Sequence, residues 1–174
     1  LAAGAKSPAT GSASTSVTIP TGTCSGTFYI IAKADADNVI PEKSETNNTK
    51  YKSIKTGPDL IVYSLTAPAT SGAGKTITVG DTTKNQGGCP AGASTTKLYF
   101  STNSTWDAGD TYLGERPVPA LAAGATNTGS TSVTIPASAT TGTRYIIAKA
   151  DANAVVTETS ETNNKKSKSI KIGP

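Results

Sequence analysis

The 174-residue sequence contains no histidine and no methionine, and it has only two cysteines and one tryptophan. Without an imidazole the chain has no histidine general base, no Ser/His/Asp or Cys/His relay and no histidine metal ligand. Aromatic residues make up only 5 % of the sequence, so an aromatic-lined sugar cleft of the kind that paired carboxylates would need in a glycosidase is not expected. We therefore predict that the chain is not an enzyme and holds no cofactor.

Long hydrophobic runs are also missing, because no apolar stretch approaches the roughly 20 residues that a membrane-spanning helix requires. The formal net charge is +4, from 16 basic and 12 acidic residues that are scattered along the chain. Nucleic-acid-binding surfaces usually concentrate basic residues in a stripe interleaved with aromatics. We therefore expect neither a membrane-spanning protein nor a nucleic-acid partner.

The most informative feature that is present is an internal repeat. Residues 16–58 recur as residues 132–174, in register at a spacing of 116 residues, and about two-thirds of these positions are identical. The sequence LAAGA at 1–5 recurs at 121–125, with four additional residues in the first copy. Residues 59–120 have no counterpart ahead of the first copy. The chain thus contains two back halves of a repeat and one front half.

This imbalance predicts the domain organisation. We interpret residues 1–58 as the C-terminal half of a repeat whose front half is missing, and residues 59–174 as a complete repeat. Identical chains that exchange halves would still leave one back half unpaired in each chain. We therefore expect the missing half in upstream sequence. If nothing precedes the chain, completion by a strand from another molecule is the alternative, because open strand edges accept added strands.

The complete repeat is predicted to be all β. Alternating β-branched and aromatic stretches are separated by Gly, Pro and Asn turns, and no segment has a helical period. The expected strands are 59–66, 75–84, 96–101, 112–117, 130–135, 143–150 and 166–172. Seven strands in one repeat indicate an antiparallel, immunoglobulin-like β-sandwich. Both alternating rows of 143–150 are largely apolar, and Lys149 favours Ile146, Ala148 and Ala150 as the inward row.

Five segments of this repeat resemble the CARDB family, immunoglobulin-like modules of bacterial and archaeal surface and secreted proteins. They are PDLIVYSLTAP, KTITVGDTTKNQGG, LYFSTNSTWDAGDTYLGE, TSVTIP and GTRYIIAKADANAVVTETSETNN. The resemblance covers all of the second repeat and the back half of the first. The sequence departs from the family pattern at Thr83, which is more polar than the residue expected on that strand. It implies an extracellular spacer or adhesion-type module without catalytic activity.

Residues 69–76, ATSGAGKT, satisfy a loose form of the phosphate-binding loop. That loop requires a following helix whose N–H groups hold the phosphates, whereas Lys75 here leads into a strand-like stretch. We interpret the segment as a turn between the first two strands.

Cys24 and Cys89 are the only cysteines. Cys24 precedes a strand of the first repeat, and Cys89 lies in a turn between the second and third strands of the second repeat. In tandem sandwiches these two loops meet at the junction, so we predict a structural disulfide between repeats, provided that the Cα atoms lie within roughly 7 Å. Intermolecular crosslinks and free thiols are the alternatives. Thr140 occupies the position of Cys24 in the second repeat.

Two sets of carboxylates and amides could hold a hard cation such as Ca²⁺. Asp107 and Asp110 follow Asn103 in one loop, where Asx-turn capping is the simpler reading. The second set occurs twice, and its repetition favours the ordering of a long loop over a metal site, so we assign no metal ligand. Its members are Asp35, Glu42, Glu45, Asn47 and Asn48, matched by Asp151, Glu158, Glu161, Asn163 and Asn164.

Trp106 is expected to be a packing anchor or a junction contact. Asn47 and Asn103 begin N-x-T sequences, which are compatible with glycosylation and also common by chance.

Together these observations predict a non-enzymatic structural module of a secreted or cell-surface stalk or fibre, bacterial or archaeal, stiffened by an inter-repeat disulfide. Its expected partners are neighbouring repeats or copies of itself. The alternatives are an adhesion or ligand-binding module for a glycan or surface protein, and accessory repeats of a larger secreted enzyme.

Overall fold

The computed structural model describes residues 14–20 and 22–174, and these residues form strands and loops without a helix. The strands are β1 (Gly26–Lys33), β2 (Thr49–Thr56), β3 (Leu60–Thr66), β4 (Thr70–Gly72), β5 (Thr76–Asn85), β6 (Ser94–Ser101), β7 (Thr111–Val118), β8 (Thr126–Thr134), β9 (Gly142–Lys149) and β10 (Lys165–Gly173). No helix in the described part of the chain is long and apolar enough to cross a membrane.

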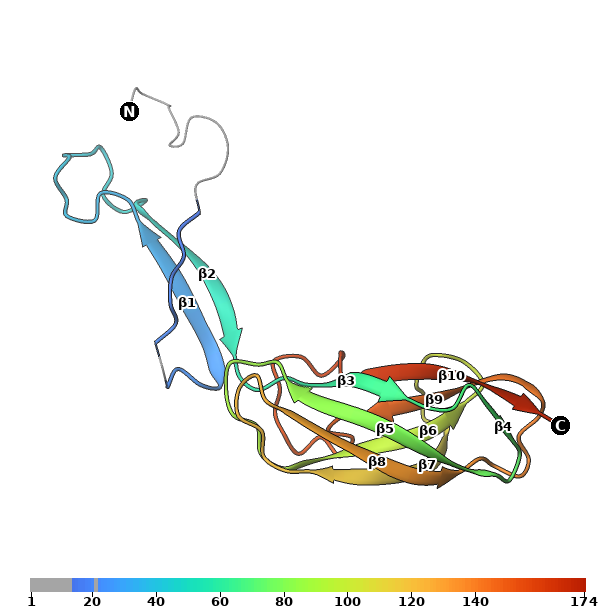
Figure 1. Ribbon diagram of the computed structural model, residues 1–174. Coiled ribbons are helices and arrows are strands. Elements are labelled where there is room, and N and C mark those ends of the chain that lie inside the picture. The colour runs from blue at the N-terminus through green and yellow to red at the C-terminus, as the bar shows by residue number, and fades with distance from the viewer. Residues whose placement is uncertain (1–13, 21) are drawn as a thin grey trace.

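Strands β3 to β10 form a β-sandwich (Figure 1). One sheet has five strands in the order β4-β10-β9-β6-β7, and the other has three in the order β3-β5-β8. All pairings are antiparallel except that of β4 with β10. The predicted all-β, immunoglobulin-like sandwich is confirmed, and each of the seven expected strands is present.

The eighth strand of the sandwich, β4, lies inside the segment that we interpreted as a turn. After β3 the chain crosses to the other sheet, and Thr70–Gly72 pairs in parallel with residues 171–173 of β10. Three residues carry no measurable alternation, so the sequence pattern gave no sign of this strand. The phosphate-loop interpretation fails here for the expected reason, because β5 begins at Thr76, directly after Lys75.

The core lies between the two sheets. Its fully buried side chains include Leu60, Val79, Leu98, Ile135, Ile146 and Ile170. Thr83 is also fully buried, and its hydroxyl lies 2.8 Å from that of Thr96. This pairing explains how a polar residue is accommodated in the core, since a buried hydroxyl is costly only when it lacks a partner.

Strand β9 is buried on both of its faces. Ile146, Ala148 and Ala150 belong to the core cluster, as the position of Lys149 led us to expect. Ile147 points to the outer face of the five-stranded sheet and is nevertheless only 1 % exposed. Its cross-strand neighbour there is Tyr99 of β6.

Trp106 packs on this outer face. Its ring lies edge-on to that of Tyr99, with centroids 5.8 Å apart. The ammonium groups of Lys149 and Lys165 lie 4.5 and 5.2 Å from its centroid. Trp106 is therefore a packing anchor on the outer face, where it contacts one aromatic ring and two ammonium groups.

Strands β1 and β2 form a separate antiparallel hairpin that stands off one end of the sandwich (Figure 1). The hairpin runs from the pair Gly26/Thr56 to the pair Lys33/Thr49. Strands β9 and β10 pair in the same register, 116 residues later, from Gly142/Ile172 to Lys149/Lys165. Within the described residues, β1 and β2 pair only with each other.

Candidate functional site: the junction between hairpin and sandwich

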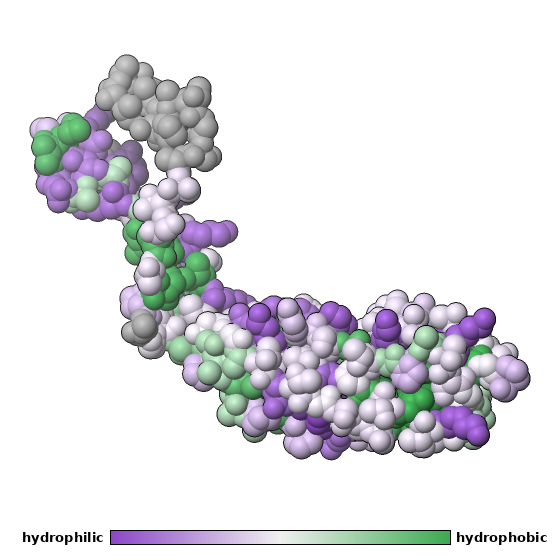
Figure 2. Space-filling view, viewed as in Figure 1, coloured by the Kyte–Doolittle hydropathy of each residue, from purple (hydrophilic) through white to green (hydrophobic). Residues whose placement is uncertain are grey.

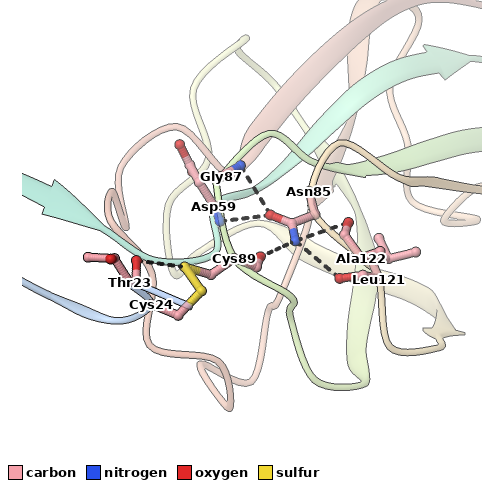
Figure 3. The surroundings of a disulfide bond; sticks show 8 residues. All are labelled: Thr23, Cys24, Asp59, Asn85, Gly87, Cys89, Leu121 and Ala122. Carbon is pink, nitrogen blue, oxygen red and sulfur yellow. Dashed lines mark hydrogen bonds between the residues drawn. A yellow bond between two sulfur atoms is a disulfide. The ribbon is translucent and has the colours of Figure 1, made fainter. Parts of the chain in front are cut away.

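A disulfide joins the base of the hairpin to the sandwich. Cys24 lies just before β1, and Cys89 lies in the loop between β5 and β6 (Figure 3). Their Cα atoms are 5.5 Å apart, within the range that a disulfide spans without backbone distortion. Cys89 is buried, whereas Cys24 is exposed. The bond therefore connects two segments that the sequence assigns to different repeats.

The chain passes between β2 and β3 through a short linker, residues 57–59, which is buried against the sandwich. Two backbone hydrogen bonds hold it there. Thr159 N–H donates to the carbonyl of Pro58 at 2.9 Å, and Gln86 N–H donates to the carbonyl of Asp59 at 2.8 Å. A linker with buried, paired backbone groups cannot swivel without breaking these bonds.

Asn85, at the end of β5, binds the linker and the disulfide loop at once. Its side chain is fully buried. Its carbonyl oxygen accepts the N–H groups of Asp59 and Gly87, each at 3.1 Å, and its amide donates to the carbonyl of Cys89 at 2.7 Å (Figure 3). The amide also faces the carbonyls of Leu121 and Ala122. A single side chain thus orders both connections across the junction.

Gly87 leaves room for the linker. A Cβ atom at this position would lie 2.6 Å from the nitrogen of Asp59 and from the carbonyl carbon of Pro58, and closer still to the carbonyl oxygen of Gly57. All three are backbone atoms, so no side-chain rotation could relieve the overlap. The adjacent Gly88 faces open space. Gly87 is therefore required for the close approach of two backbone segments.

The loop between β9 and β10 contributes carboxylates and amides to the same junction. Leu60 N–H donates to the carboxylate of Glu158, and the amide of Asn164 donates to its other oxygen at 2.8 Å. The amide of Asn163 donates to both carboxylate oxygens of Asp59, at 3.0 and 3.2 Å. The first residues of the second repeat are thus bound by its last loop.

Glu158 has an unusual electrostatic environment. Its pKa is raised from the ordinary 4.5 to about 7, mainly by burial and also by the nearby carboxylates of Glu161, Asp151 and Asp59, while donation from Leu60 N–H opposes the shift. Ionisation of this group is therefore sensitive to pH near neutrality. Because the group binds the backbone where β3 begins, its charge influences the junction.

The repeated carboxylate and amide sets order their loops in the same way in both copies. Asp151 accepts the N–H groups of Val155 and Val156 at 3.2 and 2.9 Å, and Glu158 N–H donates to Glu161 at 3.0 Å. The first copy repeats these bonds, with Asp35 accepting two N–H groups at 3.0 Å and Glu42 N–H donating to Glu45. These side chains act as loop-ordering groups.

Asp107, Asp110 and Asn103 are engaged in local turns. Asp107 accepts the N–H of Gly109 at 2.7 Å, Asp110 accepts the N–H of Asp107 at 3.0 Å, and Asn103 accepts the N–H of Thr105 at 2.8 Å. The bonds of Asp107 and Asn103, each from the N–H two residues later, are those of Asx turns, whereas Asp110 closes the loop from its other side. Asn47 and Asn103 are both exposed, and their glycosylation stays a prediction.

Sequence reasoning located the two cysteines but missed most of the junction. Asp59, Asn85 and Gly87 form its centre and were not singled out. The only available signal was the N-Q-G-G sequence at 85–88, which we used as a family motif and not as a contact. Glu158, Asn163 and Asn164 were identified as loop-ordering residues, but their bonds to each other and to the linker depend on the fold.

The sequence profile of the CARDB family matches residues 6–52 and 57–168, which is most of the chain. The chain belongs to the CARDB family. This membership confirms the resemblance noted from the five sequence segments. The two matched ranges lie on either side of the junction. No curated protein matches the chain.

A solved CARDB structure shares the fold, and a second solved domain is less similar. The CARDB domain of PF1109 from Pyrococcus furiosus, crystallised in complex with di-metal ions, has a TM-score of 0.52 at 22 % identity, covering 67 % of this chain and 89 % of that one. A domain of a Methanosarcina acetivorans protein described as a cell-surface protein has a TM-score of 0.47 at 21 % identity, covering 67 % and 92 %. At 22 % identity, the similarity to the PF1109 domain shows only that the two chains share a fold.

A β-glucosidase from Erythrobacter marinus also contains a similar region, with a TM-score of 0.45 at 15 % identity. The match covers 67 % of this chain but only 16 % of the enzyme.

Proposed function

We propose that this chain is a non-catalytic segment of an extracellular or cell-surface stalk or fibre, in which CARDB repeats follow one another with a fixed relative orientation. The observation that carries the proposal is the buried linker, residues 57–59, held between Asn85, Thr159 and Gln86. A flexible string of modules has exposed, unpaired linkers. A buried one transmits the orientation of one repeat to the next.

The disulfide supports the same function. It joins the hairpin to the sandwich at a second point beside the linker, so that the hairpin cannot move without distorting both connections. Disulfides persist in oxidising compartments such as the cell exterior, which agrees with a secreted or surface location. Because neighbours in a repeat array contact only neighbours, stiffness at each junction determines the stiffness of the whole array.

The proposal is tested by measuring how the hairpin moves relative to the sandwich. Fluorophores attached through unnatural amino acids at Asp37 and Lys171, both exposed in the structure, report this distance by single-molecule energy transfer. We expect a narrow distribution for the oxidised chain and a broader one for the Cys24→Ser/Cys89→Ser variant. An oxidised chain as broad as the variant would contradict the rod function, and two equally narrow distributions would contradict the role of the disulfide.

The proposed location needs its own test. Antibodies against the second repeat should label unpermeabilised source cells or detect the protein in the medium. Labelling only after permeabilisation would contradict a surface or secreted location.

A further inference from the structure

The hairpin exposes residues whose counterparts in the second repeat are buried. Ile31 is 64 % exposed, whereas its counterpart Ile147 is 1 % exposed. Val17, in the segment ahead of the hairpin, is 60 % exposed, whereas Val133 is 2 % exposed. Figure 2 shows the resulting apolar surface along the hairpin. Exposed clusters of this kind mark interaction surfaces.

The second repeat shows what covers these residues. The three-stranded sheet packs on the inner face of β9 and β10, and β6 pairs with the free edge of β9. Trp106 and Tyr99 lie on the outer face around Ile147. All of these groups except β8 come from the front half, residues 59–120. Among the residues that the structure describes, no strand pairs with the other edge of β1 and no second sheet packs on the hairpin.

We propose that the β1–β2 hairpin is the acceptor for the front half of another CARDB repeat, a segment with the strand order of residues 59–120. The strand of that segment equivalent to β6 pairs antiparallel with the edge of β1 opposite β2. The register follows from β6 and β9, in which Leu98 opposes Ala148 and Phe100 opposes Ile146. The corresponding acceptor positions in β1 are Ala32 and Ile30.

A second copy of this chain is a poor source of the missing half. In each copy the front half is already occupied by its own β9 and β10. A copy that donated its front half would uncover the core residues Ile146 and Ile170, so that the gain at one site would be offset by an equal loss at the other. The sequence offers a matching point of attachment, because LAAGA follows the front half directly at 121–125 and recurs at 1–5.

The loop between β1 and β2 gives independent support for the proposal that the hairpin is an acceptor. In the second repeat, Glu158 accepts the N–H of Leu60 and Asn163 donates to Asp59, so this loop holds the start of the front half. In the first repeat the matching Glu42 is bonded to Asn48, and within the described residues it receives no N–H from a linker. The loop is already folded into the binding conformation without the segment that it would bind.

The proposal is tested with an extended chain, in which a copy of residues 59–120 is placed directly ahead of Leu1 of the full chain. We expect hydrogen exchange of β1 and of residues 50–56 to slow by about a hundredfold or more, toward the rates of β9 and β10, because these amides enter a complete sandwich. The matched control is the same extension carrying Leu98→Asp in the added copy, which places a charge at a fully buried core position. In this control the exchange should stay fast.

A second readout follows the added segment itself. Trp106→Phe in the original repeat leaves the added tryptophan as the only one in the extended chain. We expect a blue-shifted, quencher-protected emission, as for a tryptophan packed over Lys33, the counterpart of Lys149. A solvent-exposed emission, or hairpin exchange that stays fast while β9 and β10 are protected, would overturn the proposal. Concentration-dependent protection of the hairpin in the unextended chain would also overturn it, because a second copy would then be the occupant.

Discussion

The two back halves of the chain, residues 16–58 and 132–174, have nearly the same sequence and opposite surroundings. Their strands pair in the same register, and their loops adopt the same unusual backbone conformation, with positive φ at Asp35 and Asp151. Yet one set of apolar side chains forms a core and the other faces solvent. Hairpin register and loop shape are therefore local properties, whereas burial depends on the half of the repeat that each back half faces.

Truncation of equivalent isoleucines gives the largest expected contrast between the two halves. Ile146→Ala removes a fully buried side chain, so we expect it to lower the free energy of unfolding of the second repeat by about 2–5 kcal/mol. Ile30→Ala changes the matching but partly exposed position, and a loss of about 1 kcal/mol or less is expected. Urea unfolding measures both. Equal losses would mean that the first back half already has a core.

The disulfide exists at only one of the two corresponding positions, because Thr140 replaces Cys24 in the second repeat. The Cys24–Cys89 bond closes a loop with a sequence separation of 65 residues. We expect Cys24→Ser/Cys89→Ser to lower the free energy of unfolding by about 2–4 kcal/mol, because the unfolded chain gains freedom. Reduction of the wild type should reproduce the loss, and a reductant should have no effect on the variant. An unchanged urea midpoint after reduction would contradict this expectation.

Adjacent glycines distinguish a required contact from a tolerated one at the junction. Gly87→Ala would press a Cβ against the linker backbone, and we expect a loss of about 1–3 kcal/mol together with faster amide exchange at Asp59 and Leu60. Gly88→Ala, which meets open space, is the matched control and should leave the exchange of the linker unchanged. Wild-type exchange in the Gly87→Ala chain would show that the linker is not held as the structure indicates.

Glu158 is expected to make the stability of the protein depend on pH. Its pKa is raised in the folded state to about 7 from 4.5, so the folded protein binds the proton more tightly than the unfolded chain does. The resulting contribution to stability is fully present below pH 4.5 and is lost as the pH rises toward and through 7. We expect Glu158→Gln to remove this decline. Thermal unfolding measured between about pH 4 and about pH 8 tests this, because the range includes both the ordinary and the raised pKa.

The same substitution at Glu42, whose carboxylate accepts a hydrogen bond from Asn48 of its own loop, is the matched comparison. A pH dependence of stability that is unchanged in the Glu158→Gln chain would mean that other groups cause it.

The fold class could be predicted from the sequence because β-strands have a periodic pattern of apolar residues, and the repeat shows part of that pattern twice. It placed seven strands, and it oriented β9 correctly from Lys149. It did not show β4, since three residues of parallel pairing leave no periodic trace. It also did not show that Ile147 is buried, because its cross-strand neighbour Tyr99 lies on β6, 48 residues earlier in the chain.

The sequence by itself determined the repeat, its register, the local shape of the hairpin loops and the two cysteines as the candidate crosslink. Only the tertiary structure decided which residues hold the junction. Asp59, the segment 85–87 and Glu158 are far apart along the chain, and they meet because the start of β3, the end of β5 and the loop after β9 lie at the same end of the sandwich. Local pattern is set by neighbouring residues, whereas a junction requires long-range closure, which no short stretch of sequence encodes.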